Sequence, residues 1–149
     1  MEKMDPVDRR IVALLMENAR LPIAEIARQV HLSRVAVRER LNRLVEEKVI
    51  QEFTAVVDGG ALGYSIAAFF EIEVQPERLE AVAKELARRE QVTIVYQMTG
   101  PTTLHVHAYL KDSKQLAVFL REHVYNIPGV VKVSTHLLLQ RFKSVLSIR

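Results

Sequence analysis

The 149-residue sequence predicts an α+β protein of two domains, because the spacing of its apolar residues changes once along the chain. Up to Leu44, apolar residues recur at helical spacing in three short segments. From Ser65 onward, β-rich segments alternate with two helical ones, and residues 58–63 hold three glycines between the two halves. We predict a winged helix-turn-helix over residues 1–52, a wing strand and hinge linker over 53–65, and a ferredoxin-like βαββαβ domain over 66–149.

The first two predicted helices are short and amphipathic. Asp5 offers an N-cap, and Pro6 follows at the first helical position, where its missing N–H costs nothing. The apolar stripes are Val7, Ile11, Leu14 and Leu15 in the first helix, and Ile23, Ile26, Ala27 and Val30 in the second. A turn at His31 and Leu32 is expected to join the second helix closely to a third.

The third predicted helix follows Ser33, whose hydroxyl can accept a hydrogen bond from a backbone N–H of the first turn. Its buried face consists of Val37, Leu41 and Leu44. At about 100° of rotation per residue, Val35, Arg38, Glu39 and Asn42 project away from the core, with Arg34 and Ala36 near the N-terminal end and Arg43 toward one flank. Arg40 lies closer to the core, and we expect it to pair with an acid of the domain.

Positive charge is concentrated on this third helix. Residues 34–43 contain four arginines and one acid, Glu39, whereas the whole chain has a net charge of only +3. Arginine and asparagine suit bidentate contacts with guanine and adenine edges, and alanine or valine suits a thymine methyl group. We therefore predict that double-stranded DNA is contacted by Ser33, Arg34, Val35, Ala36, Arg38, Glu39, Asn42 and Arg43. The alternative is that these charges merely solvate a surface helix.

The remaining segments complete a wing and the βαββαβ unit. Two short wing strands are predicted over residues 49–50 and 53–57. Further strands are expected over 66–74, 92–99, 104–110 and 130–139, and helices over 77–90 and 113–125. Two helices on one face of such a sheet leave its other face uncovered. Apolar residues on both faces, as at 137–139, indicate that a second copy packs there, so we predict a homodimer that assembles into a tetramer or octamer.

Two histidines, His105 and His107, point to the same face of a predicted strand, followed by Tyr109. Such a pair could bind a transition metal or a tetrapyrrole iron, but the sequence does not place His123 or His136 beside it as a third ligand. We interpret the pair as polar packing at the dimer contact, where its titration near neutral pH could tune association. No metal and no cofactor is predicted.

Composition and motifs exclude several classes of protein. Without cysteine, neither a disulfide nor a thiolate zinc site can form. The chain has no apolar run near 18 residues, and its charged N-terminus lacks the apolar segment of a signal peptide. Phosphate-binding loops, nucleophile elbows and paired-carboxylate motifs are absent, so we predict no catalytic residues. These observations predict a soluble, cytoplasmic protein without a membrane partner.

Several short segments follow one another at a characteristic spacing. They are Asp5-Pro6-Val7-Asp8 with Ile11, Asn18-Ala19-Arg20, Leu32-Ser33 with Val37, Arg40 and Leu44, Val49-Ile50, Leu62-Gly63, Thr99-Gly100, Ile127-Pro128-Gly129-Val130 and Val133-Ser134-Thr135. In this order they resemble the Lrp/AsnC (leucine-responsive, feast/famine) family of prokaryotic transcription factors over nearly the whole chain. The resemblance implies a regulator that binds palindromic operators as a dimer or higher oligomer, with a RAM-type (AsnC-type) second domain that binds a small-molecule effector.

Two departures from the family pattern change what the resemblance implies. Lys48 stands where members usually have glycine after the recognition helix, so we expect that helix to end without a left-handed residue. Residues 99–103 replace the Gly-Asp-x-Asp of amino-acid-responsive relatives, whose acids help to hold the ligand's ammonium group. An amino acid is therefore disfavoured as the effector. The candidate effector-binding residues are Met98, Gly100, Pro101, Thr102, Thr103 and Thr135.

The alternative function is enzymatic, because sirohaem decarboxylases resemble the same two-domain family. Such an enzyme would use histidines and arginines of its second domain on the tetrapyrrole. Four arginines on the predicted DNA helix, and the lack of an obvious arginine-lined pocket in the strands, favour the regulator.

Overall fold

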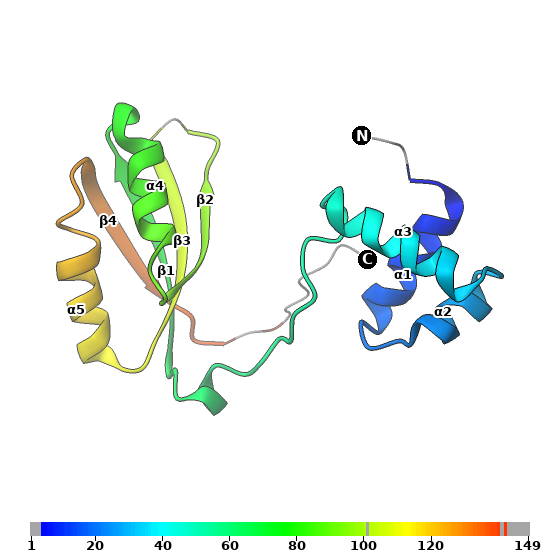
Figure 1. Ribbon diagram of the computed structural model, residues 1–149. Coiled ribbons are helices and arrows are strands. Elements are labelled where there is room, and N and C mark those ends of the chain that lie inside the picture. Colours follow the sequence, from blue (N-terminus) through cyan, green and yellow to red (C-terminus); the bar gives the residue numbers. More distant parts are fainter. Residues whose placement is uncertain (1–3, 101, 141, 143–149) are drawn as a thin grey trace. The chain divides into compact units, whose positions relative to one another are not determined.

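The computed structural model describes residues 4–100, 102–140 and 142. The chain divides into two compact units between Val56 and Val57. The first unit is helical, and the second is built on a β-sheet (Figure 1).

Three helices form the first unit, namely α1 (Pro6–Glu17), α2 (Ile23–Gln29) and α3 (Arg34–Glu46). Their apolar stripes meet in one small core, as the helical spacing predicts. The buried side chains of this core are Ile11, Leu14, Ile26, Ala27, Val37 and Leu44. The prediction of three helices around a shared core is confirmed.

Hydrogen bonds from backbone N–H groups to side-chain oxygens fix where α1 and α3 begin. The Asp5 carboxylate accepts from the backbone N–H of Asp8, and the Asp8 carboxylate accepts in return from the backbone N–H of Asp5, which makes a capping box. The Ser33 hydroxyl accepts from the backbone N–H of Ala36 at 3.1 Å. Both predicted N-caps are therefore present, and they satisfy N–H groups that a first helical turn leaves without partners.

The end of α3 differs from the expectation. Lys48 has a left-handed backbone with φ of 59°, so the expectation that the helix ends without a left-handed residue is wrong. This conformation lets the N–H of Lys48 donate to the carbonyl of Val45 and the N–H of Ile50 donate to the carbonyl of Leu44. These two bonds satisfy carbonyls at the end of the helix and offset the steric cost of a left-handed residue that carries a Cβ atom.

The predicted wing strands do not form. Residues 51–57 have no regular secondary structure, and their exposed side chains include Phe53, Val56 and Val57. A strand needs a neighbouring strand to receive its backbone hydrogen bonds, and none of the described strands pairs with this segment. The apolar residues that suggested a wing lie in an irregular linker, which ends in the short 3-10 helix η1 (Gly60–Leu62).

The second unit is a four-stranded antiparallel sheet in the order β2-β3-β1-β4. The strands are β1 (Ile66–Val74), β2 (Val92–Gln97), β3 (Thr103–Leu110) and β4 (Val130–Leu137), and the helices are η2 (Pro76–Arg78), α4 (Leu79–Ala87) and α5 (Ser113–His123). The predicted βαββαβ order is confirmed, although β2, β4, α4 and α5 each end two or three residues earlier than expected. Within the described parts of the chain, no helix is long and apolar enough to cross a lipid bilayer.

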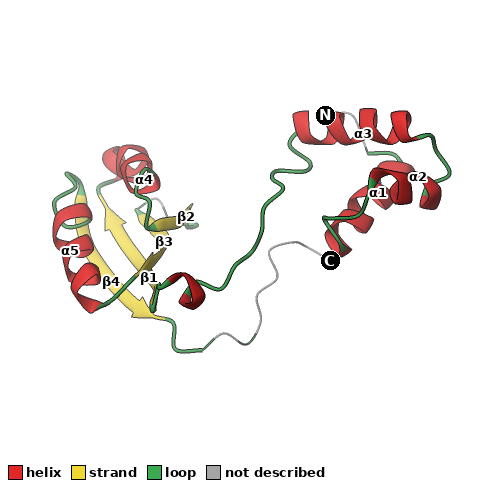
Figure 2. Ribbon diagram, turned by 60° about the horizontal axis from the view of Figure 1, so that its bottom comes forward, coloured by secondary structure: helices red, strands yellow, loops and turns green. Residues whose placement is uncertain are grey.

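Helices α4 and α5 cover the same face of the sheet (Figures 1 and 2). Alternate residues of β1 and β3 point into this core, where Phe70 packs against Phe119 of α5. Neither α4 nor α5 covers the opposite face, which we call the open face. It carries Ala67, Phe69, Glu71, Glu73, Ile94, Tyr96, Thr103, His105, His107, Tyr109, Lys132, Ser134 and His136.

Candidate nucleic-acid interface

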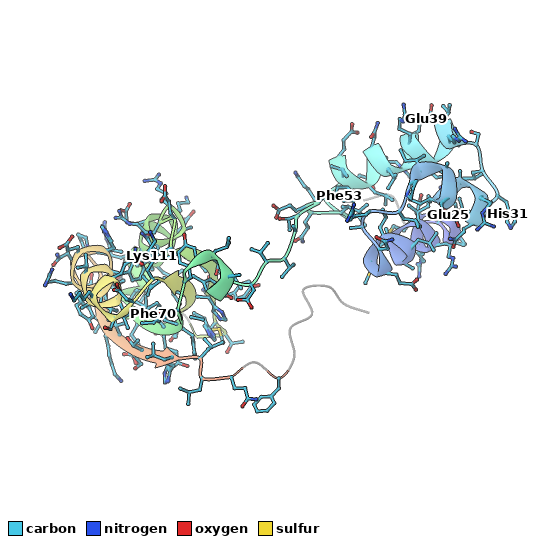
Figure 3. All side chains as sticks on the ribbon, turned by 90° about the horizontal axis from the view of Figure 1, so that it is seen from below. Glu25, His31, Glu39, Phe53, Phe70 and Lys111 are labelled. Carbon is cyan, nitrogen blue, oxygen red and sulfur yellow. The ribbon has the colours of Figure 1, made fainter. Side chains whose placement is uncertain are left out.

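Helix α3 has a buried side and an exposed side, as its spacing predicts. Val37 and Leu44 lie in the core, whereas the side chain of Val35 is 67% exposed. Figure 3 shows Glu39 on the outer side of α3, pointing away from the other two helices. The exposed residues of this side are Arg34, Val35, Arg38, Glu39 and Asn42, so five of the predicted DNA-binding residues share one accessible surface.

The remaining predicted residues are less available. The Ser33 side chain is exposed, but its hydroxyl already accepts a hydrogen bond from the Ala36 N–H. Ala36 is half-buried and lines a shallow depression together with Asp5, Glu39, Arg40 and Arg43. Any contact between Ala36 and DNA would therefore be made at the edge of the exposed side.

A buried carboxylate ties the other flank of α3 to α1. Asp8 is only 1% exposed, and one of its oxygens lies 2.8 Å from Nη1 of Arg40. The other Asp8 oxygen lies 2.6 Å from Nη2 of Arg43. The same Nη1 atom of Arg40 is 2.5 Å from an oxygen of Asp5. The expectation that Arg40 pairs with an acid of its own domain is confirmed.

Both carboxylates of this cluster are ionised at neutral pH. Burial penalises the charged form of Asp8 and acts to raise its pKa, but hydrogen bonds from Arg40 and Arg43 outweigh that effect and lower the pKa below its ordinary value. The pKa of Asp5 is also lowered, first by the backbone N–H of Asp8 and then by Arg40. The cluster is therefore a set of true ion pairs rather than neutral hydrogen bonds.

The ion pairs change the charge that α3 presents to a ligand. Arg40 and Arg43 are engaged with Asp5 and Asp8, whereas Arg34 and Arg38 form no ion pair with any described residue. Arg43 lies on the flank of α3 as predicted, but it is half-buried and hydrogen-bonded to Asp8, a partner that the sequence did not indicate. That Arg43 also contacts DNA stays a prediction.

Asp8 is a residue of this site that the sequence patterns did not reveal. The signal was the acid three residues after the Asp5 N-cap, which is the spacing of a capping box. That spacing explains the bond from Asp8 to the backbone of Asp5. The same spacing does not reveal Arg40 and Arg43, which belong to α3, more than thirty residues further along the chain.

The candidate effector-binding residues lie in two separate places. Met98, Gly100 and Thr102 belong to the turn between β2 and β3, and the N–H of Met98 donates to the carbonyl of Thr103 at the end of that turn. Thr135 lies on β4, at the opposite edge of the sheet, where it pairs with Phe70. One chain therefore does not bring Thr135 to the turn, and Pro101 lies outside the described residues.

The open face holds more histidines than the sequence could place there. His105, His107 and Tyr109 share it as predicted, and His136 joins them from β4, opposite Phe69. His123 lies instead at the end of α5, in ring contact with Phe119. No group of three or more histidine or acidic side chains among the described residues is arranged to hold a metal ion.

Replacing Asp8 with alanine is expected to lower the free energy of unfolding by about 2–4 kcal/mol, because it removes the buried carboxylate that both Arg40 and Arg43 contact. Urea unfolding of the full chain measures this loss. The matched control is Glu25→Ala, which removes an exposed pair with Arg28 and should cost less than about 1 kcal/mol. Equal losses in the two variants would contradict the structural role of Asp8.

The same ion pairs predict a loss of stability in acid. Because the folded-state pKa of Asp8 is lowered, its contribution is complete above the ordinary value of 3.8 and disappears as the pH falls through the folded value. The free energy of unfolding should therefore fall less steeply with acid in Asp8→Asn than in the wild type. Identical slopes in urea unfolding below pH 5 would show that Asp8 does not carry the effect.

Two family models together match most of the chain. The AsnC-type helix-turn-helix domain matches residues 4–45, and the Lrp/AsnC ligand binding domain matches residues 67–147. The first match covers α1 to α3, and the second covers the sheet with α4 and α5.

Relatives of similar length carry the names of regulators. The HTH-type transcriptional regulator FL11 of Pyrococcus abyssi is 36% identical over 140 residues, which span 94% of this chain and 92% of that protein. The HTH-type transcriptional regulator LrpA of the same organism is 32% identical over 140 residues, with coverage of 94% and 99%. These relatives confirm the prediction of a transcriptional regulator and give no support to the alternative of a sirohaem decarboxylase.

Solved structures share the fold of both units. The leucine response regulatory protein LrpA of Mycobacterium tuberculosis superposes with a TM-score of 0.88 at 24% identity, covering 97% of this chain and 99% of that one. The regulator NMB0573 of Neisseria meningitidis, solved in complex with L-methionine, superposes with a TM-score of 0.86 at 21% identity, covering 99% and 97%. With the fold shared and both domains matched in order, this protein belongs to the Lrp/AsnC family of helix-turn-helix transcriptional regulators.

Proposed function

We propose that the chain reads double-stranded DNA through the outer side of α3, as a sequence-specific regulator that acts as a dimer or higher oligomer. The observation that carries this proposal is that some arginines of α3 form ion pairs within the domain and others do not. Arg40 is held by Asp5 and Asp8, whereas Arg34 and Arg38 project from the exposed side. Charges that make no ion pair within the described part of the fold are available for phosphates and base edges.

Each side chain on the exposed side suits a particular contact. Arg38 and Asn42 lie one helical turn apart, so they share one side of α3 and can make bidentate contacts with guanine and adenine. Val35 offers an apolar contact for a thymine methyl group, and Glu39 can accept from a cytosine amino group. Ser33, Arg34 and Ala36 lie at the N-terminal end of the helix, where backbone phosphates are favoured.

A second copy of the chain is the proposed occupant of the open face. This face carries half-buried Phe69 and Ile94 beside Tyr96, which is 60% exposed. A two-fold dimer would bury the same surface of both copies and relate the two α3 helices by symmetry. The operator is then expected to be palindromic, with half-sites about 10 bp apart or a multiple of that spacing. A tetramer or octamer would repeat this unit.

We further propose that the second unit responds to a small molecule other than a free amino acid. The turn residues Met98, Gly100, Thr102 and Thr103 offer hydroxyl and backbone groups but no carboxylate. A zwitterion bound there would bury its ammonium group without a counter-charge, which costs more free energy than a small ligand recovers. The Neisseria regulator was solved with L-methionine, so methionine is the first amino acid to test against this proposal.

Arg38→Ala and Asn42→Ala are each expected to reduce the preference for operator over random DNA by about 1–3 kcal/mol, because each removes a bidentate base contact. Fluorescence anisotropy measures this preference. It compares binding to an operator, recovered by selection from genomic fragments, with binding to a scrambled duplex of equal length. The matched control is Arg121→Ala, which removes an exposed arginine of α5 and should change neither affinity. An unchanged preference in both α3 variants would rule out this docking of the helix.

Leucine, asparagine, lysine, glutamine and methionine are each expected to bind weakly or not at all in calorimetric titrations of the full chain, because the β2–β3 turn lacks an acid. A micromolar Kd for any of these amino acids, abolished by Thr103→Arg, would overturn the prediction. The control substitution is Thr93→Arg, at an exposed threonine of β2 outside the turn. It should leave any such binding intact.

A further inference from the structure

The centre of the open face holds a cluster of aromatic and imidazole rings that DNA binding does not use. Phe69 of β1 pairs with His107 of β3 on one side and with His136 of β4 on the other. His105 lies two residues before His107 on the same strand and the same face. Because β1 and β3 are the two central strands, this cluster lies in the middle of the sheet rather than at an edge.

Neighbouring rings hold the two histidines of β3 in place. The ring of His105 stacks on Phe69 with centroids 3.9 Å apart and an interplanar angle of 29°. The rings of His105 and His107 have centroids 5.1 Å apart, and Phe69 also lies 5.8 Å from His107. Both histidines are half-buried, so a ligand that binds them does not have to order two freely rotating side chains.

We propose that His105 and His107 chelate a divalent transition-metal ion of the zinc, nickel and copper class on the open face. Bonds of about 2.0–2.1 Å from each imidazole nitrogen to one tetrahedral ion leave the centres of the two rings about 5 Å apart. The observed separation of the two ring centres, 5.1 Å, is close to that spacing. The sequence indicated that the two histidines share one face but not how far apart their rings lie, and this spacing is the reason for revising the prediction that the chain binds no metal.

The chemistry of the ligands selects this class of metal. Neutral imidazole suits zinc, copper and nickel, whereas magnesium and calcium require several oxygen ligands. The site is therefore expected to discriminate against magnesium.

The other coordination positions are filled from outside this pair. Phe69 lies between the pair and His136, with its ring 4.9 Å from that of His136. Glu71 pairs with His105 across the strands, yet no set of three ligating side chains forms among the described residues. Water or the same two histidines of a second copy would complete the coordination shell, and the stoichiometry distinguishes these two sources.

The test is calorimetric titration of the metal-free full chain, carrying no added histidine tag, with zinc chloride and then with magnesium chloride. We expect His105→Gln and His107→Gln each to weaken zinc binding by at least tenfold, because either change leaves a single imidazole. The matched controls are His136→Gln, on the same face beyond Phe69, and His123→Gln, on α5. Both should bind zinc within about twofold of the wild type, and circular dichroism confirms that each variant folds.

One zinc ion per chain would support a site completed by water, and one per two chains would support a site shared between copies. Unchanged zinc affinity in both His105→Gln and His107→Gln would overturn the proposal, as would an equal loss in either control. The titration uses no DNA. A negative result would refute the metal site without affecting the proposal of DNA binding, and a negative DNA-binding result would leave the metal site untouched.

Discussion

The orientation of α3 depends on one buried carboxylate. Asp8 of α1 accepts hydrogen bonds from Arg40 and Arg43 of α3, and it also takes part in the capping box that begins α1. A carboxylate with 1% exposure would be costly if it were unpaired, so the helices must pack with these two arginines facing it. That requirement turns the opposite side of α3, with Arg34 and Arg38, toward solvent.

The second unit makes a similar division between its two surfaces. Alternation along β1 and β3 sends aliphatic residues and Phe70 into the core beneath α4 and α5. The same alternation sends rings and charges to the open face, among them Phe69 and His107. A sheet covered on one side only is suited to a second copy or a ligand on the other side, and the ring cluster gives its centre a specific chemistry.

Local patterns predicted the elements well and long-range partners poorly. Helical spacing and the Asp5 and Ser33 caps located α1 and α3, because capping involves residues within one turn. The number of arginines in α3 overstates its unpaired positive charge, because Arg40 and Arg43 pair with acids at the start of α1. The prediction of a wing was wrong for a similar reason. Apolar residues at 53–57 suggested a strand, but none of the described strands lies beside them to receive its hydrogen bonds. Nor could strand spacing reveal that Thr135 lies across the sheet from the β2–β3 turn.

The most direct test of DNA reading by α3 compares two equally exposed valines. A photo-crosslinking residue replaces Val35 of α3, which is 67% exposed, or Val131 of β4, which is 64% exposed. Each full-length variant is irradiated with the selected operator duplex and with a scrambled duplex. We expect the variant at Val35 to crosslink to the operator and the variant at Val131 not to. A crosslink from Val131 without one from Val35 would contradict the assignment of α3 as the DNA-reading helix.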